Sequence, residues 1–297
     1  MNFSKIGIIG YGEVGQALGR GLKNTKGLSI SVFDIQFNQD AASSELKARV
    51  EAQQLIAENN LDSLIVNNEL ILSVVTGKVA LGVVEESLPH LNKDKLFVDM
   101  NTVTPQQKVK MGELIERTGG TFIEIAILGS VASYSYKSPM LACGKKARDF
   151  ADYLNHMGFA VSFLSEKVGQ ASSMKMLRSV FAKGIEGLLF EMLVAAERCN
   201  MLEEVMNIVT AHMDRSSFLE IAESWVTTSV NHAGRRAEEM DHVIETLKNL
   251  KVHPLMAAAT KERLRKVSEL NIKELLMGEK PKDYRKVIKA VAKSNYT

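Results

Sequence analysis

The sequence predicts an α/β fold class, in which a doubly wound parallel sheet is followed by an all-α C-terminal domain. Short apolar runs alternate with helix-like segments from residue 6 to about residue 164, as they do in repeated βα units. From residue 170 onward the apolar spacing is helical throughout. We therefore predict a Rossmann-type domain at residues 1–165 and a helical domain at residues 166–297.

The composition is that of an ordinary globular protein. Of the 297 residues 45% are hydrophobic and the formal net charge is +2, which indicates neither a nucleic-acid partner nor a membrane surface. Cys143 and Cys199 are too few for a disulfide framework, and no segment is typical of a secretory signal or a membrane span. We expect a cytoplasmic protein without a metal site.

The first strand and the first helix are joined by a glycine-rich turn in SKIGIIGYGEVGQALGRGLK. In a dinucleotide-binding loop Gly10 permits the tight turn, Gly12 lets the backbone approach a pyrophosphate, and Gly15 lets the helix pack on the strand. A helix starting near Val14 aims its free N–H groups at the phosphates. We predict that this loop, including Glu13, binds the cofactor, although such turns also occur without a nucleotide.

Asp34 ends a second apolar run, SISVFD, 19 residues after Gly15. A carboxylate at this place accepts hydrogen bonds from the ribose hydroxyls of an adenosine. No Lys or Arg occurs at residues 35–38, so a 2′-phosphate would meet the carboxylate without a neighbouring cation. We therefore predict NAD as the cofactor and disfavour NADP. The alternative is that Asp34 is only a turn residue.

Three further runs, LDSLIV, ELILSVVT and KLFVDMN, are predicted to be buried strands, and a polar helix is predicted from residue 43 to 59. Two of these strands end at positions where a parallel sheet binds its ligand. We expect Val75, Thr76 and Thr102 to contact the cofactor. Asn101 is expected to bind a nicotinamide amide or a substrate hydroxyl, and its alternative role is a bond to its own turn.

The next segment, GGTFIEIAILGSVASYSYKSPMLACGK, predicts a strand, a polar loop and another strand, after which AVSFL is the last strand of the domain. Gly129 and Ser130 end the first of these strands. Free backbone N–H groups there can receive a carboxylate or a phosphate of the substrate. Glycine and serine in a flexible loop without a ligand would give the same pattern.

A long, mostly apolar helix is predicted from residue 170 to 199. Ser172, Lys175, Ser179 and Lys183 recur on it at spacings of three and four, which places them near one face. Lys175 lies among apolar neighbours, so it either extends to the surface or points into a cleft as a proton donor. The remaining predicted helices span residues 202–213, 217–230, 235–250 and 254–270, with two short pieces after residue 271.

The glycine loop with Asp34, the strand end DMNTVTP, the loop IEIAILGSV and the lysine on the following helix together resemble the β-hydroxyacid dehydrogenase superfamily. This superfamily includes 3-hydroxyisobutyrate and 6-phosphogluconate dehydrogenases. The stretches SSMKMLRSVFAKGIEGLLFE and RRAEEMDHVIETL resemble the uncharacterised helical C-terminal domain of one branch of it. The resemblance covers nearly the whole chain.

The resemblance also implies roles for particular residues. The family's substrate loop, DAPVSGG, aligns with EIAILGS, in which Leu128 replaces the serine and Ser130 replaces the second glycine. Lys175 aligns with the catalytic lysine of the family's GxGxxxK motif, and Ser179 stands where the family has an asparagine. Because two substrate contacts are altered, the identity of the substrate is not implied.

We therefore expect an NAD-dependent dehydrogenase that acts on the CH–OH group of a small anionic hydroxy acid or sugar acid. Lys175 would be its general acid and base, with Lys183 a second candidate, and Asn101, Gly129, Ser130 and Ser179 would bind the substrate. The alternatives are imine reduction, oxidative decarboxylation of a sugar acid, and, from another class, a non-catalytic NAD-binding sensor. Few charges at residues 169–199 lead us to expect a homodimer through the C-terminal helices.

Overall fold

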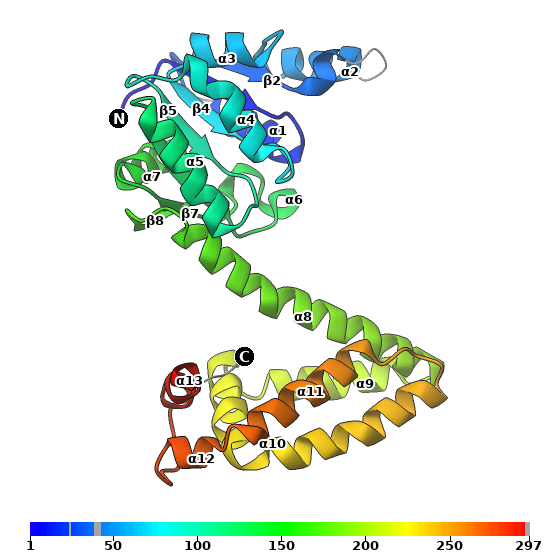
Figure 1. Ribbon diagram of the computed structural model, residues 1–297. Coiled ribbons are helices and arrows are strands. Elements are labelled where there is room, and N and C mark those ends of the chain that lie inside the picture. The colour runs from blue at the N-terminus through cyan, green and yellow to red at the C-terminus, as the bar shows by residue number, and fades with distance from the viewer. Residues whose placement is uncertain (24, 39–42, 295–297) are drawn as a thin grey trace. The chain divides into compact units, whose positions relative to one another are not determined.

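In the computed structural model, which describes residues 1–23, 25–38 and 43–294, eight strands form one sheet in the order β3-β2-β1-β4-β5-β6-β7-β8 (Figure 1). The strands are β1 (Lys5–Ile9), β2 (Ser29–Phe33), β3 (Ile56–Ala57), β4 (Leu70–Ser73), β5 (Leu96–Asp99), β6 (Thr121–Ile127), β7 (Met140–Cys143) and β8 (Val161–Ser165). All neighbouring pairs are parallel except β6 and β7. The order reverses between β1 and β4, so the predicted doubly wound sheet is confirmed.

Helices cover both faces of this sheet and bury two separate cores. One core contains Leu18, Val50 and Phe150, and the other contains Leu64 and Met111. The helices of the first face are α1 (Glu13–Leu22), α2 (Ser43–Ala52) and α7 (Ala147–His156), and those of the second face are α3 (Leu61–Asn67), α4 (Ala80–Ser87) and α5 (Pro105–Arg117). Because helices cover both sides, the central strands are mostly apolar, as the sequence predicted, and the polar residues Ser73, Asp99 and Glu124 in them are buried.

Two predictions about the first half of the chain were wrong. LDSLIV forms α3 and not a strand, because the Asn60 side chain accepts the N–H of Ser63 and caps a helix there. Its apolar residues fit either kind of element, and only the cap and the length of the segment separate the two. The helix predicted to reach residue 59 ends at Ala52, since Gln54 adopts a φ of +58° and the next residues pair with β2 as β3.

Other local predictions are confirmed. Thr104, with Pro105 after it and Gln107 three residues later, has the sequence pattern of a capping box at a helix start. This box starts α5: Thr104 accepts the N–H of Gln107, and the Gln107 side chain accepts the N–H of Thr104. The polar loop between β6 and β7 contains the short helix α6 (Val131–Tyr134). The long helix predicted from residue 170 is α8 (Gln170–Arg198).

The chain divides into two compact units, residues 1–179 and residues 180–297, so the first part of α8 belongs to the sheet unit. The predicted boundary between a dinucleotide-binding domain at residues 1–165 and a helical domain for substrate binding or dimerisation at residues 166–297 stays a prediction. The described part of the helical unit contains, beyond α8, the helices α9 (Leu202–Met213), α10 (Phe218–Asn249), α11 (Leu255–Glu269), α12 (Ile272–Leu275) and α13 (Tyr284–Lys293). The predicted all-α domain is thus confirmed.

One boundary in the helical unit was predicted wrongly. The break expected between residues 230 and 235 does not occur, and α10 is continuous through Gly234. A Cβ at Gly234 would lie 2.9 Å from the Ser268 hydroxyl of α11, so this glycine allows two helices to approach closely. Among the described residues, no helix has both the length and the apolar character needed to cross a membrane.

Candidate active site

The three glycines after β1 have different surroundings, and at each position the absence of a side chain has a different consequence. Gly10 has a φ of +95°, and a Cβ there would lie 2.7 Å from the carbonyl oxygen of Val74. At Gly15 a Cβ would lie 2.1 Å from the carbonyl oxygen of Gly10, so α1 packs directly on the loop. A Cβ at Gly12 would have nothing within 4 Å. The loop therefore leaves open space beside Gly12, in front of the N-terminus of α1, which fits a pyrophosphate.

Asp34 holds this loop in place from the end of β2. Its carboxylate accepts the N–H of Tyr11 at 2.7 Å and the N–H of Gln36 at 3.0 Å. The second of these bonds is the turn interaction that the alternative interpretation required. The first joins the carboxylate to the glycine loop, so Asp34 also shapes the place where a ribose would lie. The two interpretations are therefore compatible.

A cleft of about 790 Å³ runs along the carboxyl ends of β2, β1 and β4. It lies at the point where the strand order reverses, which is where open α/β sheets bind their ligands. Seven of the residues predicted to bind the cofactor line it: Gly10, Gly12, Glu13, Val14, Asp34, Val75 and Thr76. Lys78 also lines the cleft, but it follows β4, which β1 separates from β2.

A second, smaller pocket of about 220 Å³ continues the cleft toward β5 and β6. The two cavities share the side chains of Val14, Val74 and Val75. Besides the shared Val14 and Val75, four predicted site residues line this pocket, and they come from three different segments of the chain: Asn101 and Thr102 after β5, Gly129 after β6, and Lys175 on α8. All of them belong to the sheet unit.

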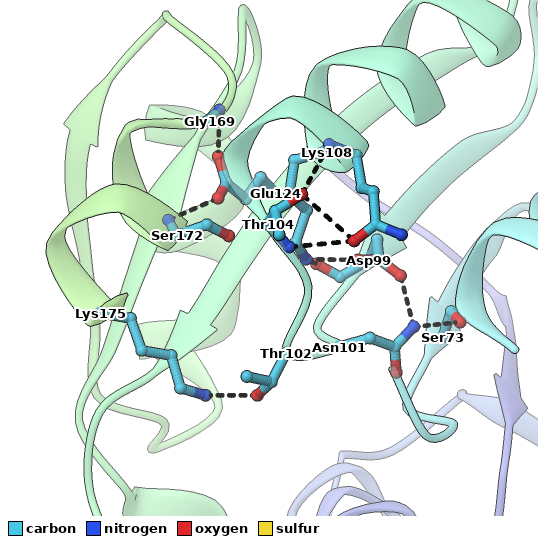
Figure 2. Close-up of polar contacts among 11 residues, drawn as sticks. Ser73, Asp99, Asn101, Thr102, Thr104, Lys108, Glu124, Gly169, Ser172 and Lys175 are labelled. Carbon is cyan, nitrogen blue, oxygen red and sulfur yellow. Dashed lines mark hydrogen bonds and ion pairs between the residues drawn. The ribbon is translucent and has the colours of Figure 1, made fainter. Parts of the chain in front are cut away.

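Lys175 points toward the end of β5. Its Nζ donates a hydrogen bond of 2.8 Å to Oγ1 of Thr102, and the two side chains meet in Figure 2. Burial lowers the pKa of the Lys175 ammonium, and the positive charges of Lys108 and Arg178 lower that pKa further. Of the two orientations left open by the sequence, the structure therefore has the one that enters a cavity. Lys183, the second candidate, is exposed.

The other two residues predicted to bind substrate make local bonds. Ser130 accepts the N–H of Ser133 at 3.2 Å and caps α6. The hydroxyl of Ser179 donates to the carbonyl oxygen of Lys175, one turn earlier in α8, at 2.8 Å. Neither lines the small pocket, and their binding of a substrate stays a prediction.

A buried ion pair lies directly behind the pocket, and the sequence did not single it out. Asp99 and Lys108 are both fully buried and form a salt bridge, and Lys108 also donates to the main-chain oxygen of Asp99 at 3.0 Å. Burial raises the pKa of the Asp99 carboxyl, and the charge of Lys108 together with the amide of Asn101 opposes this rise. The only signal in the sequence was a carboxylate at the end of an apolar run, nine residues before a lysine.

Glu124 fixes the start of α8 and thereby the position of Lys175. This fully buried carboxylate, on β6, accepts the N–H groups of Gly169 at 2.5 Å and of Ser172 at 2.6 Å (Figure 2). A carboxylate at the first turn of a helix satisfies its free N–H groups and complements its dipole. In the sequence, Glu124 is recognisable only as the first residue of EIAILGS, the segment that resembles the family's substrate loop.

Arg178 joins α8 to that same loop. Its Nη1 donates a hydrogen bond of 2.8 Å to the carbonyl oxygen of Leu128. Leu128 stands where the family has a serine, and its side chain cannot form a hydrogen bond. Its main-chain carbonyl oxygen still accepts one, and the donor is the Arg178 cation. Sequence reasoning did not select Arg178, because an arginine three residues after a lysine is common on helices.

The strand order, the glycine turn at its reversal and the pocket at the strand ends define a dinucleotide-binding fold of the dehydrogenase type. The chain belongs to the family of the NAD binding domain of 6-phosphogluconate dehydrogenase, which matches residues 5–164, more than half of its length. Residues 196–267 match a helical domain of unknown function, DUF1932. The predicted superfamily and its branch are therefore confirmed.

Three similar proteins illustrate this relationship. An uncharacterized 28.5 kDa protein of Methanothermus fervidus is 26% identical over 89% of this chain and 99% of its own length. A solved protein of unknown function, described as structurally similar to 3-hydroxyacid dehydrogenases, is 29% identical over 90% of this chain and 98% of its own, with a TM-score of 0.58. An imine reductase from Streptomyces aurantiacus has a TM-score of 0.74 at 16% identity, over 98% and 100% of the two chains.

The buried ion pair makes a prediction about stability. Lys108→Met leaves the Asp99 carboxylate buried without its partner charge, so we expect the free energy of unfolding in urea to fall by about 3–5 kcal/mol. The double variant Asp99→Asn/Lys108→Met removes both charges and is expected to recover most of that loss. A single variant as stable as the parent protein would show that the pair is not charged in the folded state.

Proposed function

We propose that this protein is an NAD-dependent oxidoreductase that transfers a hydride between the nicotinamide and a small anionic hydroxy acid or sugar acid. The observation that supports this most directly is the position of Lys175. Its partly desolvated ammonium lies in a small pocket whose walls continue those of a dinucleotide-sized cleft. A protein that only binds a dinucleotide has no need of an acid or base at that place.

Lys175 would move the proton that accompanies hydride transfer. When bound, the nicotinamide ring supplies the hydride acceptor or donor. In the oxidation, a neutral Lys175 amine takes the hydroxyl proton of the substrate, and in the reduction the ammonium returns it. Thr102 Oγ1 holds the Nζ in the pocket, at 2.8 Å. Because its pKa is lowered, Lys175 loses its proton more readily than an exposed lysine does.

The preference for NAD rests on Asp34. Its carboxylate is fixed at the mouth of the cleft by two N–H groups, and residues 35–38 contain no Lys or Arg. A 2′-phosphate would meet this negative charge, whereas two ribose hydroxyls would donate hydrogen bonds to it. We therefore propose that NAD is preferred to NADP.

A second candidate function is the reduction of an imine. It is supported by the similarity of fold to imine reductases and by the replacement of two of the family's substrate contacts by Leu128 and Ser179. Oxidative decarboxylation of a sugar acid uses the same proton transfer and is a third possibility within redox chemistry. A sensor that binds NAD without chemistry is the alternative from another class.

Replacement of Lys175 tests the proposed mechanism. We expect Lys175→Met to lower turnover by about 10²–10⁴-fold while NAD still binds, because the cleft does not include this side chain. Turnover is followed by NADH absorbance across a panel of hydroxy acids, sugar acids and imines. Lys183→Met, an exposed lysine of the same helix, is the matched control and should retain full activity.

The panel separates the candidate functions. Turnover of imines alone would replace the first candidate by the second. Bound NAD without turnover of any member of the panel would favour the sensor. Unchanged turnover in Lys175→Met would remove this residue from the mechanism.

We also propose that two copies of the chain associate through their C-terminal helices. Large apolar side chains of the helical unit are exposed, among them Phe190 at 69%, Ile208 at 71% and Leu255 at 66%, and burial of such surface drives association. Light scattering at micromolar concentration is expected to give twice the mass of the chain. A monomer mass under those conditions would contradict the proposal.

A further inference from the structure

The side-chain amide of Asn101 is satisfied on one side only. Its nitrogen donates to Oγ of Ser73 at 2.9 Å and to the carboxylate of Asp99. Its oxygen is buried and has no hydrogen-bond partner within the described residues. The residue is 5% exposed and lines the small pocket. Figure 2 shows the nitrogen facing Asp99 and Ser73 and the oxygen directed away from both.

The neighbouring charges determine which way this amide is turned. If the amide were reversed, its oxygen would face the Asp99 carboxylate, and two acceptors would be in contact. Lys108, which is fully buried and forms a salt bridge with Asp99, favours the charged form of this carboxyl against the effect of burial. A carboxylate accepts hydrogen bonds only. The ion pair therefore keeps the nitrogen of Asn101 toward Asp99 and turns the oxygen of this pocket-lining residue to the opposite side.

A buried oxygen without a partner in the protein calls for a hydrogen-bond donor from a water or a ligand, because an unsatisfied buried acceptor is costly. The order of the strands indicates which donor it meets. Asp34 follows β2, the glycine loop follows β1, and Ser73 ends β4, next to the β5 residue Asn101. A dinucleotide whose ribose lies at Asp34 and whose pyrophosphate lies at Gly12 would bring its nicotinamide to β4 and β5.

We propose that Asp99, with Lys108, is a positioning residue that turns the Asn101 oxygen toward the amino group of the nicotinamide carboxamide. The contact selects a nicotinamide that carries an N–H donor at this place. This inference rests on the proposed function, since it requires that the cleft binds the dinucleotide. Asn101 is bonded to β4 on the side of the cofactor cleft, whereas Gly129 and Lys175 approach the pocket from β6 and α8.

The experiment compares NAD with 3-acetylpyridine adenine dinucleotide, in which a methyl group replaces the amino group of the carboxamide. Calorimetric titration of the full chain gives the two dissociation constants and their ratio. Because the analogue leaves the buried oxygen unsatisfied, we expect NAD to bind roughly 5- to 150-fold more tightly. The ratio of the two dissociation constants isolates this contact, because a loss of overall stability would weaken the binding of both ligands alike.

Two variants test the residues separately. Asn101→Leu removes the acceptor, so the ratio should fall to near one. Asp99→Asn/Lys108→Met keeps the acceptor but removes the charge that orients it, so the ratio should also fall. Lys110→Met is the matched control, because Lys110 lies on the same helix as Lys108 and forms an exposed ion pair with Glu85 at 3.4 Å. It should keep the ratio of the parent protein, and circular dichroism establishes that each variant is folded.

The outcomes distinguish this inference from the proposed function. If the parent protein binds NAD tightly but the ratio of its two dissociation constants is near one, the inference is wrong and the proposed function stays in place. A large ratio that persists in Asn101→Leu, with a raised KM for the substrate, would assign Asn101 to the substrate and also overturn it. Failure of the parent protein to bind any nicotinamide dinucleotide would overturn both.

Discussion

Five parallel strands end at one edge of the sheet, and each segment of the candidate site begins just beyond one of those ends. The strands β2, β1, β4, β5 and β6 lie in this spatial order. They carry Asp34, the glycine loop, Val75, Asn101 and Gly129 respectively. Residues that are far apart in the chain are therefore aligned in a row at the carboxyl ends of the strands, where open α/β sheets bind their ligands.

The last residue of this row, Lys175, does not follow a strand. Lys175 belongs to α8, and the start of this helix is attached to β6 by the two hydrogen bonds that Glu124 accepts. A fully buried carboxylate is costly unless it is well satisfied, so these bonds also bind the helix firmly to the sheet. Two buried carboxylates thus serve the pocket: Glu124 positions the helix of Lys175, and Asp99 orients Asn101.

The sequence was sufficient where a residue's role depends on its immediate neighbours. The glycines of the first loop, the capping box at Thr104 and the position of Asp34 are local patterns, and they predicted the fold and the cleft. The sequence was insufficient where a role depends on contacts between distant segments. Asp99 and Lys108 face each other only because α5 folds back over β5. In LDSLIV the apolar spacing suited both a strand and a helix, and the Asn60 cap decided between them.

The proposed mechanism depends most directly on the state of the Lys175 ammonium. The measurement that tests it is an NMR titration of isotope-labelled lysine side chains, in which the Lys175 signal is assigned by its absence from Lys175→Met. We expect Lys175 to lose its proton at a lower pH than an ordinary solvated lysine does, because burial and two nearby cations lower its pKa. Titration of Lys175 together with the exposed lysines would show that it is a solvated surface residue, and the proposed mechanism would then be wrong.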